Sequence, residues 1–581
     1  MKKPMRIISL LLALLLLCSC GGAGEAEPSA PETPDEQTAE QPAEVSNEGE
    51  DVPSEGEPDS IQPSQMELLN SALVPQADED AYRTTYEVFV YSFYDSDGDG
   101  IGDLGGLTEK LDYINDGDPA SGDELGCTMI WLMPVFPSPT YHKYDTTDYM
   151  DIDPQYGTLE DFDHLLAECH ARGIRLILDL AINHTSSEHP WFTTAADYLR
   201  SLPQDAEPSV EECPYVDYYN FTREAANGYA QVPGTSWYYE ARFWSGMPDL
   251  NLDSEAVRNE IAEITGFWLD RGVDGFRLDA VTSYYTESRL DSIAFMGWLT
   301  DTVKSQNPEA YLVAEGWADQ GTYASYYESG IDSMFDFAFA DGDGTIARVV
   351  KGTTSASAFG EAMESEEALY ASYNPDYINA PFYTNHDMAR STGYYAWDDG
   401  SHTKLAGALN LLMTGNAFVY YGEELGMKGS GKDENKRAPM YWTEDADAEG
   451  MCVGPQDMES FEMKFPSLET QAVDSYSVYV YYRNAIRIRN SFPVIARGAT
   501  AVVEEMSDKE ICAFTRIKEG TDLEPVLVVI NASEEAKTVP LSGDGADYTT
   551  LSAVLTVSED QVALAGDQLT LPAFGIAVLT R

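Results

Sequence analysis

The feature of this sequence that most constrains its fold is a series of short apolar segments that alternate with helical patterns. Residues 257–270, for example, carry apolar side chains at helical spacing, and residues 271–281 then supply a short apolar burst. Strand and helix alternating in this way over several hundred residues predict an α/β fold with a parallel sheet, which at this length closes into a TIM (β/α)8 barrel. The predicted strands are rich in β-branched and aromatic residues and lie within residues 86–91, 129–136, 175–182, 271–281, 310–314, 380–384 and 417–421.

The alternation is broken at two places, which divides the predicted folded part into three domains. A long insert rich in Tyr, Pro and Trp follows the third predicted strand at residues 186–247. From residue 491 onwards only short strands are predicted, within residues 502–503, 511–517, 525–530 and 569–579. We therefore expect a barrel from residues 82–185 and 248–490, an inserted domain at 186–247, and a C-terminal all-β sandwich domain at 491–581.

The first 20 residues predict a secretory signal peptide. Lys2 and Lys3 precede an apolar run at residues 7–17, which is too short to span a membrane. Residues 17–20 (Leu-Cys-Ser-Cys) resemble a bacterial lipobox, which makes Cys20 the predicted lipid-modified residue; cleavage elsewhere without lipid is the alternative. A lipid on Cys20 would be the only membrane attachment that we expect, and it would hold an extracellular protein at the cell surface.

Residues 21–81 predict a disordered tether. They contain no Lys or Arg and consist mainly of Glu, Asp, Pro, Ser, Ala, Gln and Gly, so they cannot bury enough apolar surface to fold. The whole chain has 34 Lys and Arg against 100 Asp and Glu, a formal charge of −66. This charge argues against nucleic acid or anionic lipid as a partner, because both require basic patches.

An acidic turn directly after the first predicted strand indicates a Ca²⁺ site. Carboxylates alternate with glycines there, and a hard cation needs several oxygens from a tightly turned chain. An EF-hand would need Glu at the twelfth position, where this chain has Gly106. A solvated acidic turn without metal is the alternative. The predicted ligands are the side chains of Asp95, Asp97, Asp99 and Asp103 and the carbonyl of Ile101.

Polar side chains gather where the predicted strands end, at the mouth of the barrel. Arg277 and Asp279 are two residues apart on one strand and therefore share a face. A guanidinium beside a carboxylate keeps it ionised, as a nucleophile or an electrostatic stabiliser requires. Isolated structural salt bridges are the alternative, but they do not explain the full set. That set comprises His142, Tyr144, Asp145, Asp179, Asn183, His184, Arg277, Asp279, Glu315, Trp317, Asn385, His386 and Asp387.

Four motifs in this set resemble the main sequence regions of the α-amylase superfamily of glycoside hydrolases. They are residues 179–184, 275–279, 314–315 and 385–387. Residues 247–251 resemble a further region, in a form similar to a group between oligo-1,6-glucosidases and neopullulanases that contains bacterial α-amylases. The acidic turn resembles a calcium loop of the same group. The resemblance covers residues 82–581 and implies a TIM barrel with an inserted B domain after strand 3.

The resemblance also implies the role of each site residue. Asp279 would attack the anomeric carbon and form a covalent glycosyl-enzyme, while Arg277 keeps Asp279 ionised. Glu315 would protonate the leaving oxygen and then activate water, which requires a raised pKa. Asp387 would bind ring hydroxyls and favour the distorted sugar. The other substrate-binding residues would be Tyr144 stacked on that sugar, Asp145 holding Arg277 or a hydroxyl, His184 and His386 bonded to the same ring, and also His142 and Trp317.

Two positions depart from the family pattern. Many α-amylases carry Lys-His shortly after the nucleophile, where this chain has Thr282-Ser283. The usual calcium between the barrel and the B domain is therefore in doubt, and Asn183 is expected to be structural. Ala280 stands where Val is associated with α-1,6 preference in related enzymes, so Ala280 favours α-1,4 bonds.

These features together predict an extracellular α-amylase that cleaves internal α-1,4 bonds of starch, glycogen or maltodextrins by double displacement. We expect a monomer with a structural Ca²⁺ and no organic cofactor. Within the same mechanism, the alternative is an exo-acting α-glucosidase, an oligo-1,6-glucosidase or a transglycosylase. From a different class, the alternative is an inactive glucan-binding surface lipoprotein. Such a protein would be expected to lose catalytic carboxylates, and Asp279, Glu315 and Asp387 are all present.

Overall fold

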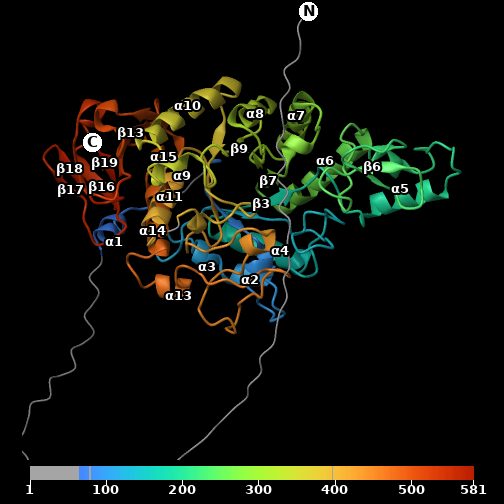
Figure 1. Cartoon of the computed structure of the whole chain (residues 1–581), viewed down its shortest axis with the longest axis horizontal. Coiled ribbons are helices and arrows are strands. Elements are labelled where there is room, and N and C mark those ends of the chain that lie inside the picture. Colours follow the sequence, from blue (N-terminus) through green and yellow to red (C-terminus); the bar gives the residue numbers. More distant parts are fainter. Residues whose placement is uncertain (1–63, 77–79, 396) are drawn as a thin grey trace, which may run out of the picture. The chain divides into compact units, whose positions relative to one another are not determined.

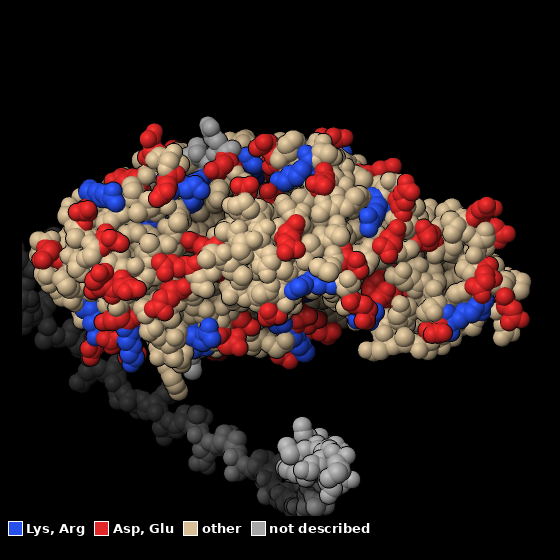
Figure 2. Space-filling model, turned by 90° about the horizontal axis from the view of Figure 1, so that it is seen from above, with Lys and Arg blue, Asp and Glu red and all other residues tan. Residues whose placement is uncertain are grey.

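The computed structural model describes residues 64–76, 80–395 and 397–581. The predicted signal peptide, Cys20 and most of the predicted tether lie outside these residues. Within the described part, no helix combines the length and the apolar character that crossing a membrane requires. On the face drawn in Figure 2, acidic side chains are spread widely and Lys and Arg are scattered among them.

Eight parallel strands form the barrel, as predicted. Their order is β10-β9-β8-β7-β3-β2-β1-β11, and a parallel bridge between Phe382 and Phe418 links the two ends of the sheet. The strands are β1 (Thr84–Val88), β2 (Met129–Leu132), β3 (Arg175–Leu180), β7 (Gly275–Leu278), β8 (Tyr311–Ala314), β9 (Ser333–Phe335), β10 (Ile378–Ala380) and β11 (Ala417–Tyr420).

Helices connect and cover these strands (Figure 1). The α-helices of the barrel and its extensions are α2 (Leu104–Glu109), α3 (Leu111–Ile114), α4 (Leu159–Ala171), α6 (Glu255–Arg271), α7 (Arg289–Gln306), α8 (Gln320–Ala324), α9 (Thr345–Val350), α10 (Ser357–Tyr373), α11 (Ser401–Leu411), α12 (Asp433–Lys436), α13 (Leu468–Gln471), α14 (Val478–Ser491) and α15 (Val494–Arg497). Gly272 ends α6 as a cap in the left-handed conformation.

Side chains of the barrel strands alternate between two cores. Trp131 and Tyr311 belong to a cluster inside the barrel, whereas Phe276 and Leu278 of β7 pack outward in the large core under the helices. Arg277 therefore points into the barrel, where its guanidinium lies 5.0 Å from the centre of the Trp131 ring. This alternation delivers a buried charged side chain to the barrel interior.

The insert and the chain end form separate antiparallel sheets, so the predicted fold class is confirmed. Between β3 and β7 lie α5 (Pro190–Ser201) and a three-stranded sheet of β4 (Phe221–Thr222), β6 (Tyr238–Glu240) and β5 (Tyr229–Gln231). After α15 come a five-stranded sheet in the order β12-β13-β14-β19-β16 and a three-stranded sheet in the order β15-β18-β17. Their strands are β12 (Ala499–Val502), β13 (Ile511–Ile517), β14 (Val526–Asn531), β15 (Lys537–Pro540), β16 (Thr550–Leu555), β17 (Ala563–Ala565), β18 (Gln568–Leu571) and β19 (Ile576–Thr580).

The structure corrects three details of the strand predictions. The sequence does not predict β9, because three residues are too few to show a periodic pattern. The strand predicted at residues 380–384 ends at Ala380, and the residues after it form the loop that leads into the site. The single strand predicted at residues 569–579 is two strands, since the chain turns between them with Phe574 in the left-handed region (φ +54°).

The predicted tether also ends earlier than residue 81. Residues Gln65–Asn70 form helix α1, whose amino terminus is closed by a capping box between Ser64 and Glu67. Met66 is buried, and the Asn70 amide donates to the Asn484 side chain and to the Val554 carbonyl. Figure 1 shows α1 beside β16. This short segment thus forms a helix because α14 and β16 bury its few apolar side chains.

Candidate active site

Arg277 is the centre of the site and contacts three carboxylates. Its Nη1 donates to both oxygens of Asp179 at 2.9 Å and to Asp279 Oδ1 at 2.7 Å, and its Nη2 donates to Glu315 Oε2 at 2.9 Å. The Arg277 side chain is fully buried. Asp279 and Glu315 are 7% and 6% exposed, which leaves each open at one edge. One buried cation therefore fixes the predicted nucleophile and the predicted acid relative to each other.

The strand ends explain how these groups meet. Asp279 directly follows β7 and Glu315 directly follows β8, which is the neighbouring strand. After Asp279 the backbone turns sharply, because Ala280 adopts the left-handed conformation (φ +45°), and its N–H donates to Glu315 Oε2 at 3.2 Å. The turn at Ala280 thus also supplies a backbone hydrogen bond to the Glu315 carboxylate.

The electrostatic environment separates the roles of the two carboxyl groups. Burial raises the pKa of Glu315 to about 7, helped by the nearby Asp279 and Asp387 and opposed by Arg277. A carboxyl group with a pKa near neutrality suits a general acid and base. Asp279 Oδ1 accepts from the Arg277 guanidinium at 2.7 Å, which fixes the orientation of this carboxylate, as an attack on the substrate requires.

Asp387 enters the site from the loop after β10. Its Oδ1 accepts from Arg437 Nη2 at 2.8 Å, and its Oδ2 lies 3.1 Å from Nε2 of His386. Burial opposes ionisation, but His386 and Arg437 together hold the pKa of Asp387 well below its ordinary value. Asp387 is therefore a fixed carboxylate over the whole neutral range.

Tyr144 and the two predicted histidines complete one wall. The Tyr144 ring stacks on His386 with centroids 5.6 Å apart, and its hydroxyl donates to Asp179 Oδ2 at 3.1 Å. His184 is buried, and its Nε2 lies 3.2 Å from the Tyr144 carbonyl, to which it donates in the corresponding tautomer. The structure thus brings Tyr144, His184 and His386 to the predicted site.

His142 and Trp317 lie at the edge of this group. His142 Nδ1 accepts from the Tyr144 backbone N–H at 3.2 Å, and burial together with Arg437 lowers the pKa of His142 to about 4. Trp317 follows Glu315, is 53% exposed and lies 5.2 Å from the Phe337 ring. An exposed indole beside a second ring is a surface on which a sugar ring could stack.

Asp145 bonds within its own loop, and the described carboxylates that pair with Arg277 are Asp179, Asp279 and Glu315. Asp145 is buried, and its Oδ1 accepts from the hydroxyls of Ser138 at 2.8 Å and of Thr140. These bonds close the loop after β2 on itself. The carboxylate that holds Arg277 from that side is Asp179, the inward residue next to Arg277 in the β3–β7 register.

Three further residues take part in the site: Asp179, which the predicted set includes without a role, and two residues that the sequence analysis does not name. Asp179 belongs to a recognised motif, and its position on a strand was the available signal. Glu87 on β1 contacts His386, and a charged residue between the apolar Tyr86 and Val88 could have indicated it. Arg437 comes from the segment after β11, and the sequence offers no spacing that indicates it.

Arg437 should be needed for activity because it holds Asp387 from a separate segment. Besides its bond to Asp387, it donates to the Tyr141 hydroxyl at 3.1 Å and to the His386 carbonyl at 3.3 Å. A hydrogen bond to a charged group contributes about 1.5–3 kcal/mol, so Arg437→Ala should lower kcat/KM roughly 10- to 100-fold. Steady-state kinetics on a maltooligosaccharide would measure this. Lys432→Ala removes an exposed cation of the same segment and serves as the control; an Arg437→Ala enzyme as active as this control would contradict the prediction.

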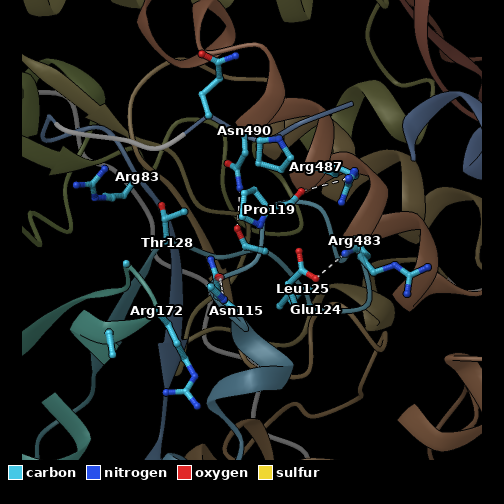
Figure 3. A pocket seen from close by; sticks show the side chains of 17 residues that line it. Arg83, Asn115, Pro119, Glu124, Leu125, Thr128, Arg172, Arg483, Arg487 and Asn490 are labelled. Carbon is cyan, nitrogen blue, oxygen red and sulfur yellow. Dashed lines mark hydrogen bonds between the residues drawn. The ribbon is translucent and has the colours of Figure 1, made fainter. Parts of the chain in front are cut away.

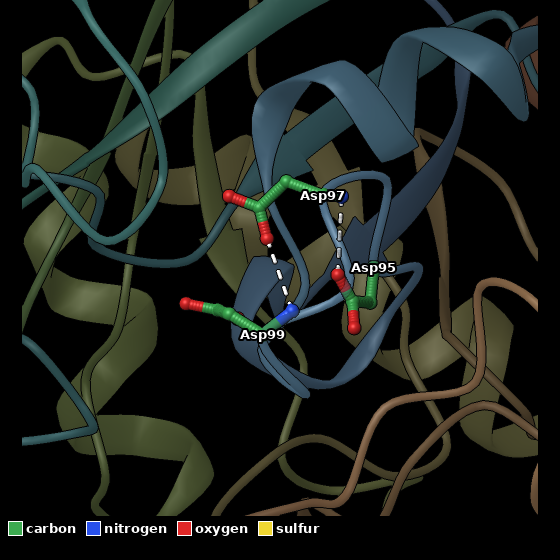
Figure 4. A group of neighbouring side chains, drawn as sticks. All are labelled: Asp95, Asp97 and Asp99. Atoms are coloured by element: carbon green, nitrogen blue, oxygen red, sulfur yellow. Dashed lines mark hydrogen bonds between the residues drawn. The ribbon is translucent and has the colours of Figure 1, made fainter.

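The acidic turn brings three of its carboxylates together. Asp95, Asp97 and Asp99 each have an oxygen within 4.8 Å of the other two (Figure 4). Backbone N–H groups of the turn bond to its own carboxylates: Asp97 N–H donates to Asp95, and Ile101 N–H donates to Asp99. Three converging carboxylates are a donor set that fits a hard cation such as Ca²⁺.

Asp103, another predicted ligand, lies outside that group. Its carboxylate caps helix α2, accepting from Gly106 N–H at 2.8 Å, and it also accepts from the backbone and hydroxyl of Ser96. The turn therefore has a core of three carboxylates, with Asp103 anchoring its far end to a helix.

Residues at the joint between insert and barrel pair among themselves. The Asn183 amide donates to Asp249 Oδ1 at 3.3 Å, and the Arg242 backbone N–H donates to Asp249 Oδ2 at 3.2 Å. Arg242 Nε also donates to Glu240 at 2.6 Å. The Arg242 guanidinium thus lies among the acidic side chains that face Asn183, and Asn183 bonds to one of them.

A separate hollow of about 300 Å³ lies at the amino-terminal ends of the barrel strands, away from the strand ends that carry the site (Figure 3). Three of the residues that line it stand just before the first three barrel strands: Arg83 before β1, Thr128 before β2 and Gly173 before β3. Arg487 points along its wall and donates to backbone carbonyls of Asn70 and Leu73. The predicted site residues lie at the opposite ends of the strands.

Comparison with known proteins gives consistent matches over most of the chain. The family model described as "Alpha amylase, catalytic domain" matches residues 87–498. Alpha-amylase 3 of Dictyoglomus thermophilum is 38% identical over 454 residues, which cover 77% of this chain and 84% of that protein. The solved structure of Eubacterium rectale Amy13B is 52% identical, with a TM-score of 0.86, and covers 90% of this chain and 99% of that one. An alpha-amylase from H. orenii is 34% identical, with a TM-score of 0.74, and covers 86% and 100%.

Proposed function

The chain belongs to the alpha-amylase family of glycoside hydrolases, and we propose that it cleaves internal α-1,4-glucosidic bonds of starch, glycogen or maltodextrins. The observation that carries this proposal is the Arg277 guanidinium that holds Asp279 and Glu315 together. The name of the similar Dictyoglomus protein supports it further.

The proposed reaction is a double displacement. In the first step Asp279 attacks the anomeric carbon, and Glu315 gives its proton to the glycosidic oxygen as that bond breaks. In the second step the Glu315 carboxylate takes a proton from water, the resulting hydroxide attacks the anomeric carbon, and the bond to Asp279 breaks. Two inversions leave the sugar in the α configuration. Asp387 and His386 orient ring hydroxyls during both steps.

Incubation with soluble starch tests this function. An endo-acting enzyme yields a ladder of α-anomeric maltooligosaccharides and a fast loss of iodine staining. Glucose as the only early product would replace the proposal by an exo-acting α-glucosidase. Binding of starch without any product would replace it by a glucan-binding protein.

We also propose that the acidic turn binds a structural Ca²⁺ through Asp95, Asp97 and Asp99. At a Ca²⁺ concentration a hundredfold above Kd, binding to the folded state alone adds about 2.7 kcal/mol, which for a chain of this size raises Tm by roughly 2–3 °C. Adding a chelator should reverse the shift in differential scanning fluorimetry. Asp97→Asn should abolish the response to Ca²⁺, whereas Asp118→Asn, in an exposed turn nearby, should keep it. Equal responses of the two variants would place the ion elsewhere.

We further propose that the protein is a monomer held outside the cell by a lipid on Cys20. The lipobox-like residues 17–20 and the acidic, Lys- and Arg-free segment that follows support this location. Protease treatment of intact cells should release the catalytic part, and Cys20→Ser should move the protein to the medium. A catalytic part protected from the protease would overturn the proposal.

A further inference from the structure

Glu87 is a buried charge in the barrel that the double displacement does not use. It lies on β1, opposite Trp131 of β2, with Tyr86 and Val88 pointing outward to the helices. Its side chain is 1% exposed. An ionised carboxylate in this interior is costly unless a positive partner faces it.

The partner of Glu87 is His386. Glu87 Oε1 lies 2.6 Å from His386 Nδ1, and the other ring nitrogen, Nε2, lies 3.1 Å from Asp387 Oδ2 and 2.7 Å from the Tyr144 hydroxyl. The imidazole is fully buried between the two carboxylates. A neutral imidazole has one N–H and satisfies one carboxylate, whereas an imidazolium donates to both. The Tyr144 hydroxyl donates to Asp179 Oδ2 at 3.1 Å, so a neutral ring that donates to Glu87 would leave Nε2 facing Asp387 with no proton between them. The contacts on both sides of the ring thus favour the protonated form.

We propose that Glu87 is a positioning residue that keeps His386 an imidazolium, which in turn holds Asp387 ionised and aimed at the substrate. The kinetic consequences rest on the proposed function, but the charge state of His386 does not. The imidazolium adds a permanent positive charge to a site whose carboxylates are otherwise paired with Arg277 and Arg437. Such a charge next to the sugar favours a fixed orientation of Asp387 through both steps.

The surrounding charges agree with this assignment. Burial alone would lower the pKa of His386, but Asp387 and Glu87 raise it to about 9. The other charged groups that face His386 are Asp179 of β3 and Glu315 after β8, which favour the imidazolium. Two positive groups disfavour the imidazolium. They are Arg277 on β7, which contacts Tyr144, and Arg437, which donates to the His386 carbonyl. Tyr144 and Trp131 supply the rings that pack against it.

Glu87→Gln tests the proposal, because glutamine keeps the size and a hydrogen-bond acceptor while it removes the charge. Nuclear magnetic resonance of the full chain with isotope-labelled histidine follows the His386 titration without substrate, and His386→Gln assigns the signal. The wild-type ring should stay protonated through pH 8, and Glu87→Gln should lower its pKa by at least one unit, a tenfold change in acidity. Glu87→Asp should restore the protonated form.

Glu424→Gln is the matched control, since Glu424 is also a buried carboxylate beside β1 but bonds to the hydroxyls of Tyr86 and Tyr113. It should leave the His386 titration unchanged. A neutral His386 in the wild-type protein at pH 7, or equal titration in wild type and Glu87→Gln, would overturn the proposal. The wild-type measurement alone decides if Glu87→Gln does not fold.

The pH dependence of kcat/KM provides a second readout that a purely structural role would not move. In the wild type, one proton, that of Glu315, should set the alkaline limb. In Glu87→Gln a second proton, from His386, should also be lost, so that the limb falls at lower pH with a slope near two. If the pKa of His386 falls from about 9 to about 8, kcat/KM should drop about twofold relative to wild type at pH 8 and about fivefold at pH 9, with no such loss at pH 5.5. An unchanged slope would contradict the role of His386 in catalysis, and absence of all hydrolysis would contradict only the proposed function.

Discussion

Replacing Asp279 by Asn should lower kcat on maltooligosaccharides by about 10⁴-fold or more, because no glycosyl-enzyme can form without the carboxylate. The change conserves shape, and Arg277 keeps its bonds to Asp179 and Glu315, so the protein should stay folded. Kinetics with purified protein, paired with circular dichroism and thermal unfolding, would measure both effects.

A second variant identifies Asp279 as the nucleophile rather than a structural partner of Arg277. Asp279→Ala, supplied with azide and a glycosyl fluoride, should give a β-glycosyl azide, because the small anion attacks from the face that Asp279 vacated. Asp253→Asn changes an exposed carboxylate in the segment before α6 and should retain activity. Substantial activity of Asp279→Asn on starch would exclude the assignment.

Replacing Glu315 by Gln should lower kcat on starch by roughly 10²- to 10⁴-fold, the usual contribution of a general acid. The loss should be much smaller for the first step on a maltosyl fluoride, because fluoride leaves without protonation. A burst of fluoride followed by slow turnover would show that glycosyl-enzyme forms and waits for a general base. An equal loss on both substrates would mean that Glu315 positions the sugar instead.

The alkaline limb of the pH profile should also report Glu315. Its pKa is raised to about 7, so the group is protonated, and able to act as an acid, at pH values below about 7. Activity should fall as pH rises through that value. Because Gln does not titrate, this limb should disappear in Glu315→Gln.

Much of the fold followed from local patterns. Strands such as β3 and β8 are apolar on both faces because they lie between the barrel interior and the helices, and this burial is visible in the sequence. Helix α6 was equally clear from the helical spacing of apolar side chains in residues 257–270. The strand β9 was not, because a three-residue strand is defined by its neighbours and not by its own period.

The helix α1 shows the same limit at the edge of the fold. Its residues follow an acidic segment with no basic residue, which predicts disorder. Asn70 nevertheless bonds to α14 and β16, more than 400 residues away in the chain, and Met66 is buried. No local pattern can contain a surface that distant elements provide.

For the site, the sequence determined which residues stand at strand ends, since Arg277 and Asp279 must share a face and Glu315 follows the next strand. The tertiary structure alone decided the partners. In the structure Asp145 bonds within its own loop, and Asp179 pairs with Arg277. Arg437 pairs with Asp387, and Glu87 contacts His386. The physical reason is that strand spacing fixes directions along one segment, whereas charge pairing depends on distances between segments. Those distances exist only once the barrel has closed.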